Sequence, residues 1–153
     1  MFITLHSAMA VSVAAAVGVD QPLVAFGLGW LLHYVGDAIP HGDESLGRWA
    51  KKSHSPAVRM GLMFLVDLVF LVLALLWCQQ QGRLTSVVWA ALVGSALPDL
   101  LVGLELAVRR KFTGPLAVLH ERAHHLIGWE YSPWIGVPLQ VVLAAVLWWR
   151  IGR

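Results

Sequence analysis

Long apolar stretches separated by short polar segments form the main pattern of this sequence. The stretches cover residues 2–19, 22–39, 57–78, 86–106 and 134–149. Their lengths are close to the roughly 17–25 residues that a helix needs to cross a bilayer core of about 30 Å, and the first, second and last are near the lower limit. The pattern therefore predicts an all-α, polytopic transmembrane helical bundle with about five spans, or with four spans and a re-entrant segment.

The composition agrees with a membrane protein. Hydrophobic residues make up 58% of the 153 residues and charged residues 13%, whereas roughly a quarter of residues are charged in soluble domains. The length fits a single domain, residues 1–153. No basic residue precedes the first stretch, so we do not expect it to be a cleaved signal peptide. The net charge of +2 comes from basic residues in loops, which does not indicate binding of nucleic acid.

Basic residues are concentrated in two loops, one after the second apolar stretch and one after the fourth. They are Arg48, Lys51, Lys52, Arg59, Arg109, Arg110, Lys111 and Arg122. Loops rich in lysine and arginine stay on the cytoplasmic side of a membrane, and these two loops lie on the same side of a five-span topology. We therefore expect the N-terminus and both loops to be cytoplasmic.

Most ionisable residues in or next to the apolar stretches fall at the ends that face this same side. They are His6, His33, Asp37, Asp99, His120, His124 and His125. Asp67 differs because it lies deep inside the third stretch. A carboxylate inside a span costs roughly 2.5–3.5 kcal/mol on insertion scales, so Asp67 and Asp99 indicate a partner or a polar cavity. Pro98 frees a backbone carbonyl and favours an inward turn of Asp99.

Two pairs of these residues have the spacing of metal ligands on a helix. His33 with Asp37, and His120 with His124, are each four residues apart, which places both side chains of a pair on one helix face. Imidazole and carboxylate ligands together suit zinc, iron or manganese. The two pairs therefore predict a metal site.

The turn after the second stretch adds further candidates. Pro40 must stop that helix, so His41 and Asp43 fall in a turn that can fold back towards the same cavity. The predicted core ligands are His33, Asp37, Asp99, His120 and His124, and the second-line candidates are His6, His41 and Asp67. These residues suffice to bind a divalent metal cofactor, and zinc is favoured. They also suffice for two ions, and two ions about 3.5–4 Å apart form the clamp that hydrolyses phosphoesters.

The second histidine pair lies in a segment with a second interpretation. Residues 120–124 read HERAH, which fits the H-E-x-x-H pattern of zinc peptidases. In that pattern the two histidines hold the metal and Glu121 is the general base. The segment also suits a short interfacial helix before the last span, because Leu119, Ala123 and Ile127 can form an apolar stripe. Both interpretations stay open.

The order of these motifs resembles small bacterial integral-membrane proteins grouped as inner-membrane metal-dependent hydrolases. The matching segments are TLHSAMA with His6, H-x-x-x-D-x-x-P-H-x-D from His33 to Asp43, Asp67, G-x-x-L-P-D ending at Asp99, and H-x-x-x-H-H from His120 to His125. The resemblance implies a compact helical bundle in the bacterial inner membrane with a histidine and aspartate metal site, distantly similar to zinc-dependent phospholipase C. The chain departs from the pattern where Leu100 and Leu101 follow Asp99.

Three functional hypotheses follow. The first is a membrane-embedded metal-dependent hydrolase that acts at the cytoplasmic face on a phosphoester of a lipid or amphiphile, with Glu121 and Asp99 as candidates for catalytic proton transfer. The second is a zinc peptidase in the membrane that uses His120, Glu121 and His124. The third is a non-catalytic accessory subunit of a larger membrane complex, whose histidines hold a structural metal, haem or pigment. Membrane lipid is the environment in all three hypotheses and the substrate in the first.

Overall fold

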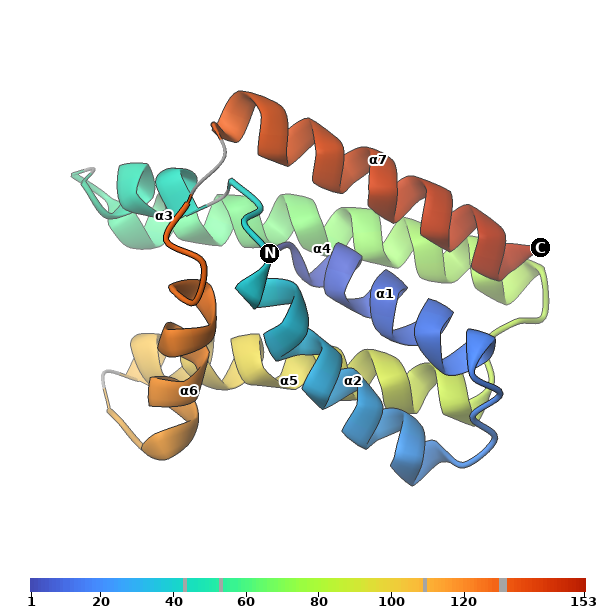
Figure 1. Ribbon diagram of the computed structural model, residues 1–153. Helices are drawn as coiled ribbons and strands as arrows, with labels where there is room; N and C mark the ends of the chain where they lie inside the picture. The colour runs from blue at the N-terminus through green and yellow to red at the C-terminus, as the bar shows by residue number, and fades with distance from the viewer. Residues whose placement is uncertain (43, 53, 109, 130–131) are drawn as a thin grey trace.

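The computed structural model of the chain describes residues 1–42, 44–52, 54–108, 110–129 and 132–153. Within these ranges it contains seven α-helices and no strand (Figure 1). The helices are α1 (Ile3–Ala16), α2 (Pro22–Ala38), α3 (Glu44–Lys51), α4 (Pro56–Gln80), α5 (Ser86–Val108), α6 (Pro115–His124) and α7 (Pro133–Gly152). The expected all-α fold is confirmed, and α6 is the predicted short helix before the last long one. Asp43, a candidate ligand, and Arg109, one of the basic loop residues, lie outside the described residues.

Proline and glycine set several helix boundaries. Prolines begin α2, α4, α6 and α7, a position where the missing N–H leaves no helical hydrogen bond unmade. After α1 and α4, Gly18 and Gly82 adopt φ values of 70° and 67°, a left-handed conformation that ends a helix and that glycine reaches without steric cost. The helix α2 ends at Ala38, two residues before Pro40, because the residue before a proline is disfavoured in a helix.

Three helices are long and apolar enough to cross a membrane. They are Val58–Gln80, Ser86–Glu105 and Pro133–Gly152, which lie within α4, α5 and α7. The expected five spans are not confirmed, since α1 and α2 have 14 and 17 residues. The turn at Gly18 ends α1 before the apolar stretch itself ends. The 14 residues of α1 rise only about 21 Å, which is less than a bilayer core of about 30 Å.

The first helix is the central element of the bundle. It packs against α2, α4, α5 and α7 (Figure 1), and its small and aliphatic side chains, including Leu5, Ala8 and Val11, are buried among them. The outward faces of α4, α5 and α7 instead carry exposed apolar side chains such as Leu73 and Val93. A large exposed apolar surface is typical of contact with lipid or a partner, so these faces agree with membrane association.

Glycines allow α2 and α5 to approach closely. A Cβ on Gly29 would clash with the backbone of Ala91, and a Cβ on Gly94 would clash with the backbone of Phe26. Small residues at a helix contact let two backbones come together in this way. The contact places His33 of α2 beside the backbone of α5, where its Nδ1 reaches the carbonyl of Ser95.

The helix directions gather the polar helix ends at one end of the bundle. There α1, α4 and α7 begin, α2 and α5 end, and α6 lies alongside (Figure 1). This arrangement agrees with the expectation that the ionisable residues share one side. The short helix α3 packs against α4. The apolar pattern did not predict this helix, because few of its eight residues are apolar.

The glycine contact can be tested with Gly94→Val. We expect this change to lower the free energy of unfolding in detergent by about 1–3 kcal/mol, because the new side chain must push α2 and α5 apart. Gly103→Ala on the same helix is the matched control, since nothing lies within 4 Å of a Cβ there, and it should be neutral or slightly stabilising. Equal thermal unfolding of both variants would contradict the close contact.

Candidate metal centre

Two overlapping groups of ligand-type side chains meet where α2, α5 and α6 converge. The first group consists of His33, Asp37, Asp99 and His120, and the second of Asp37, His41 and His124. In each group, one ligand atom from each residue lies within 4.8 Å of all the others. Asp37 belongs to both groups, so a single carboxylate connects them.

The separations between ligand atoms fit a bound ion. Asp37 Oδ2 lies 3.0 Å from His33 Nε2 and 3.2 Å from His120 Nε2. Asp99 Oδ1 lies 3.4 Å from His120 Nε2 and 3.8 Å from His33 Nε2. Ligands about 2.0–2.1 Å from a tetrahedral zinc ion are about 3.3 Å from one another. The first group therefore has nearly the dimensions of a four-ligand site.

The tautomer of His33 leaves an electron pair pointing at the carboxylates. The carbonyl of Ser95 can only accept a hydrogen bond, so His33 Nδ1 donates to it at 2.8 Å and Nε2 carries a lone pair in the neutral ring. Both His33 Nε2 and Asp37 Oδ2 are buried without a hydrogen-bond partner. Two electron-pair donors 3.0 Å apart repel each other unless a proton or a metal ion lies between them, so this pair supports the metal site that the geometry of the group indicates.

A backbone contact also orients His41 in the second group. Its Nδ1 donates to the carbonyl of Ile39 at 2.6 Å. The ligand atom is therefore Nε2, which lies 2.7 Å from the amino group of Met1, so an ion in the second group would take the place of this contact. Such hydrogen bonds to the second nitrogen are the usual way in which metal-binding histidines are held. The side chain of Gln140 in α7 donates to the carbonyl of His41 at 2.9 Å and so fixes the turn after α2. The expectation that His41 folds back from a turn towards the cavity agrees with this geometry.

The two histidines of α6 face Asp37 together. Their Nε2 atoms are 3.0 Å apart, and His124 Nε2 lies 3.4 Å from Asp37 Oδ2. Burial lowers the pKa of His124 to about 4, so its imidazole is neutral near pH 7 and able to bind a metal. Burial acts in the same direction on His120, but the nearby carboxylates of Asp37 and Asp99 outweigh it and raise the pKa of His120. The carboxylates thus attract positive charge to this position.

His6 lies behind Asp37 and outside both groups. Its Nε2 donates to Asp37 Oδ1 at 2.9 Å, and its ring stacks on His33 with a centroid separation of 4.2 Å. The sequence predicts His6 as a second-line candidate for a metal ligand. In the structure it holds the opposite oxygen of the carboxylate whose Oδ2 faces His33, so its place is that of a positioning residue.

Asp67, another second-line candidate, is not brought to the cluster. Its Oδ2 accepts the backbone N–H of Ile3 at 2.7 Å and its Oδ1 that of Thr4 at 3.3 Å. The Thr4 hydroxyl donates to the backbone carbonyl of Asp67 at 2.9 Å. A carboxylate is favourable at the N-terminal end of a helix, where N–H groups lack partners. Asp67 therefore caps α1 from α4, which accounts for a charge inside an apolar span.

Glu121 also lies away from the cluster. Its carboxylate accepts a hydrogen bond from His125 Nε2 at 3.0 Å, and its side chain is 76% exposed. Successive helix positions are about 100° apart, so a helix that turns His120 and His124 inward turns Glu121 outward. This placement does not support Glu121 as the general base of a zinc peptidase.

No protein-family model, curated protein or solved structure matches the chain. The structure itself defines the class of protein: an all-α chain with three helices long and apolar enough to span a membrane and a buried histidine and aspartate cluster that could bind a metal ion. Ser95 and Gln140 were missed as supporting residues. The backbone carbonyl of Ser95 orients His33, and the side chain of Gln140, on a distant helix, holds the backbone carbonyl of His41. The local sequence carries no signal for either contact.

Asp37→Ala tests the shared carboxylate. We expect the purified variant to lose nearly all bound zinc, manganese or iron by elemental analysis, because both groups lose a ligand. His125→Ala is the matched control, since His125 neighbours His124 but pairs with the exposed Glu121, and its metal content should equal that of the unchanged chain. Unaltered metal content in Asp37→Ala would contradict the site.

His6→Phe tests the positioning role. The phenyl ring preserves the stack on His33 but cannot donate to Asp37, so we expect metal affinity to fall about 10–100-fold while stoichiometry at saturation is retained. The affinity is measured by titration against a competing chelator, with the exposed His54→Phe as control. A lower stoichiometry at saturation would instead indicate that His6 is a direct ligand.

Proposed function

We propose that the chain is a membrane-embedded metal-dependent hydrolase that cleaves a phosphoester of a lipid or amphiphile. The observation that carries the proposal is the sharing of Asp37 between two ligand groups. A carboxylate that can bridge two ions is the characteristic ligand of two-metal sites, which hold both the attacking and the leaving oxygen of a phosphoryl group. The resemblance of the motif order to inner-membrane metal-dependent hydrolases points to the same activity.

The proposed ligands divide between two ions. One ion would be held by His33, Asp37, Asp99 and His120, and the other by Asp37, His41 and His124. The second set has three protein ligands, and catalytic zinc sites keep a fourth position open for water or substrate. Nitrogen and oxygen donors of this kind favour zinc, with manganese or iron as alternatives. A divalent ion there would supply Lewis acidity and would lower the pKa of water towards 7.

The exposure of the cluster indicates where a substrate would enter. The side chains of His33 and Asp37 are fully buried, whereas those of Asp99 and His124 are 25% and 23% exposed. The cluster is thus closed on the side of α1 and partly open on the side of α5 and α6. On this open side Asp99 is placed to accept a proton from the attacking water or to orient it. This role replaces Glu121, which lies too far outward.

The position of the cluster also bears on the substrate class. Its ligands come from the end of α2, the turn after it, α5 and α6, towards the end of the bundle where α4 and α7 begin (Figure 1), so the cluster lies in the half of the bilayer nearer that face. A phosphoester of a lipid or amphiphile reaches this level without leaving the membrane. We place this end at the cytoplasmic face of a bacterial inner membrane because the basic loops accompany it.

Activity is tested on the full chain in detergent, with a nitrophenyl phosphodiester and a short-chain phospholipid as substrates. We expect the zinc- or manganese-loaded protein to hydrolyse at least one of them, and dialysis against a chelator to abolish the reaction. Asp99→Asn should lower kcat about 100-fold or more, because the change removes a proposed acid–base group and also a charged ligand of one ion. Glu121→Gln should stay within about twofold, since its carboxylate faces away from the cluster.

Two results would redirect the assignment. Stoichiometric metal without hydrolysis of either phosphoester would favour a structural metal in an accessory subunit of a membrane complex. Cleavage of a protein substrate that is lost in Glu121→Gln would restore the zinc-peptidase hypothesis.

A further inference from the structure

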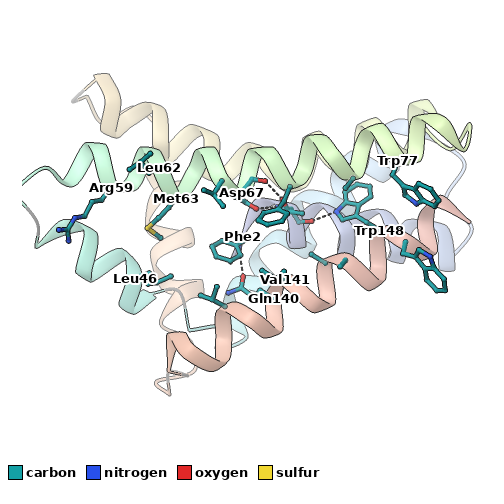
Figure 2. Close-up of a pocket in the computed structure, with 18 of the residues that line it drawn as sticks. Phe2, Leu46, Arg59, Leu62, Met63, Asp67, Trp77, Gln140, Val141 and Trp148 are labelled. Atoms are coloured by element: carbon teal, nitrogen blue, oxygen red, sulfur yellow. Dashed lines mark hydrogen bonds between the residues drawn. The ribbon is translucent and has the colours of Figure 1, made fainter.

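A long cavity lies between α4 and α7, on the other side of α1 from the metal centre. Its volume is about 700 Å³, which falls within the roughly 300–1,000 Å³ of small-molecule sites. The walls are apolar and include Leu62, Val66 and Phe70 of α4 and Val141 and Ala145 of α7. Figure 2 shows these two helices on either side of the cavity, with Arg59 at one end and Trp77 at the other. We call this cavity the α4–α7 groove.

Two polar side chains in the wall of the groove are already bonded within the protein. Asp67 accepts the backbone N–H groups of Ile3 and Thr4. Gln140 accepts the N–H of Phe2 at 2.9 Å and donates to the carbonyl of His41. These groups have little left to offer a polar ligand, so the body of an occupant that fits the groove is apolar.

One end of the groove carries a positive charge. The guanidinium of Arg59 lies 4.0 Å from the ring centroid of Trp49, a favourable cation–π distance. Trp49 and Leu46 are three residues apart on α3 and both line the groove, so they share one face of this short helix. No carboxylate of the described residues pairs with Arg59. Its charge therefore remains available to an anionic group at the end of the groove.

The length of the groove matches the membrane. Arg59 and Trp77 both line it, and their separation along α4 corresponds to about 27 Å, close to a bilayer core of about 30 Å. Tryptophans stand at both ends, Trp49 at one and Trp77 with Trp149 at the other, and tryptophan favours the membrane interface. The end at Arg59 is thus at headgroup level, and the apolar wall beyond it runs into the hydrocarbon core.

We propose that the α4–α7 groove binds one acyl chain of an anionic phospholipid whose phosphate lies at Arg59. A parallel second copy fits less well, because its own basic segment would meet Arg59 and Lys52 at the same depth and like charges repel. The site is separate from the metal centre, since Phe2 and Thr4 at the start of α1 line the groove while His6 on the same helix contacts Asp37. The proposal goes beyond the hydrolase function and does not require it.

The test uses the full chain reconstituted in vesicles of phosphatidylcholine with a minority of phosphatidylglycerol. A phosphatidylglycerol probe with a photoreactive acyl chain maps the site, and native mass spectrometry after mild detergent extraction counts the retained lipid. We expect one phosphatidylglycerol per chain, with cross-links confined to the groove-facing residues of α4 and α7. Phosphatidylcholine should be retained far less.

Two variants with matched controls test separately the charge of Arg59 and the fit of the acyl chain in the groove. Arg59→Gln should lower retained phosphatidylglycerol about fivefold, the scale of one basic residue at an anionic headgroup, whereas Lys111→Gln, an exposed cation outside the groove lining, should not. Ala145→Trp fills the groove and should abolish the cross-links. Val142→Trp, on the same helix but 58% exposed and outside the groove lining, should leave them in place.

Metal content measured on the same samples shows that the variants at Arg59, Lys111, Val142 and Ala145 are folded. Asp99→Asn should retain the lipid even if metal and hydrolysis are lost. Three results would each overturn the proposal. They are equal retention of both lipids, cross-links spread over all outward helix faces, and cross-links between two protein chains through α4 and α7. Unchanged binding in both Arg59→Gln and Ala145→Trp would do the same.

Discussion

The buried carboxylate of Asp37 is the constraint on which the site depends. An ion of this kind costs several kcal/mol to bury unless partners and hydrogen bonds offset the penalty. Here the partners are His6 from α1, His33 from α2, which also carries Asp37, His120 and His124 from α6, and the amino group of Met1. His33 Nε2 and Asp37 Oδ2 have no hydrogen-bond partner, and a cation bound between them would satisfy both.

The rest of the bundle serves to keep these helices at the required distances. Glycines bring α2 against α5 closely enough for His33 to reach the backbone of Ser95. Asp67 holds the beginning of α1 from α4, and Trp148 of α7 donates to the carbonyl of Thr4 at 3.0 Å. The contacts of Asp67 and Trp148 fix the start of α1, and through it the position of His6 behind Asp37.

This organisation gives the two sides of α1 different chemistry. One side contacts the charged cluster at the end of the bundle, and the other lines an apolar groove that ends at a cation. A polar centre in one half of the bilayer beside a groove for a hydrocarbon chain suits a protein whose substrates and ligands are amphiphiles. The two sites differ in chemistry but share a wall, because Gln140 lines the groove and also donates to the carbonyl of His41.

The sequence by itself determined the features that depend on neighbours within one helix. It indicated the apolar helices, the pairs His33–Asp37 and His120–His124, and an inward role for Asp99, because four-residue spacing and a charge in a span carry their meaning locally. Only the tertiary structure decided that Asp67 caps α1, that His6 supports Asp37, and that Glu121 faces outward. It also decided that α1 ends after 14 residues and that α4 and α7 enclose a groove. These outcomes depend on how each helix is rotated and which helix lies beside it, and such contacts between distant residues leave no periodic pattern in the chain.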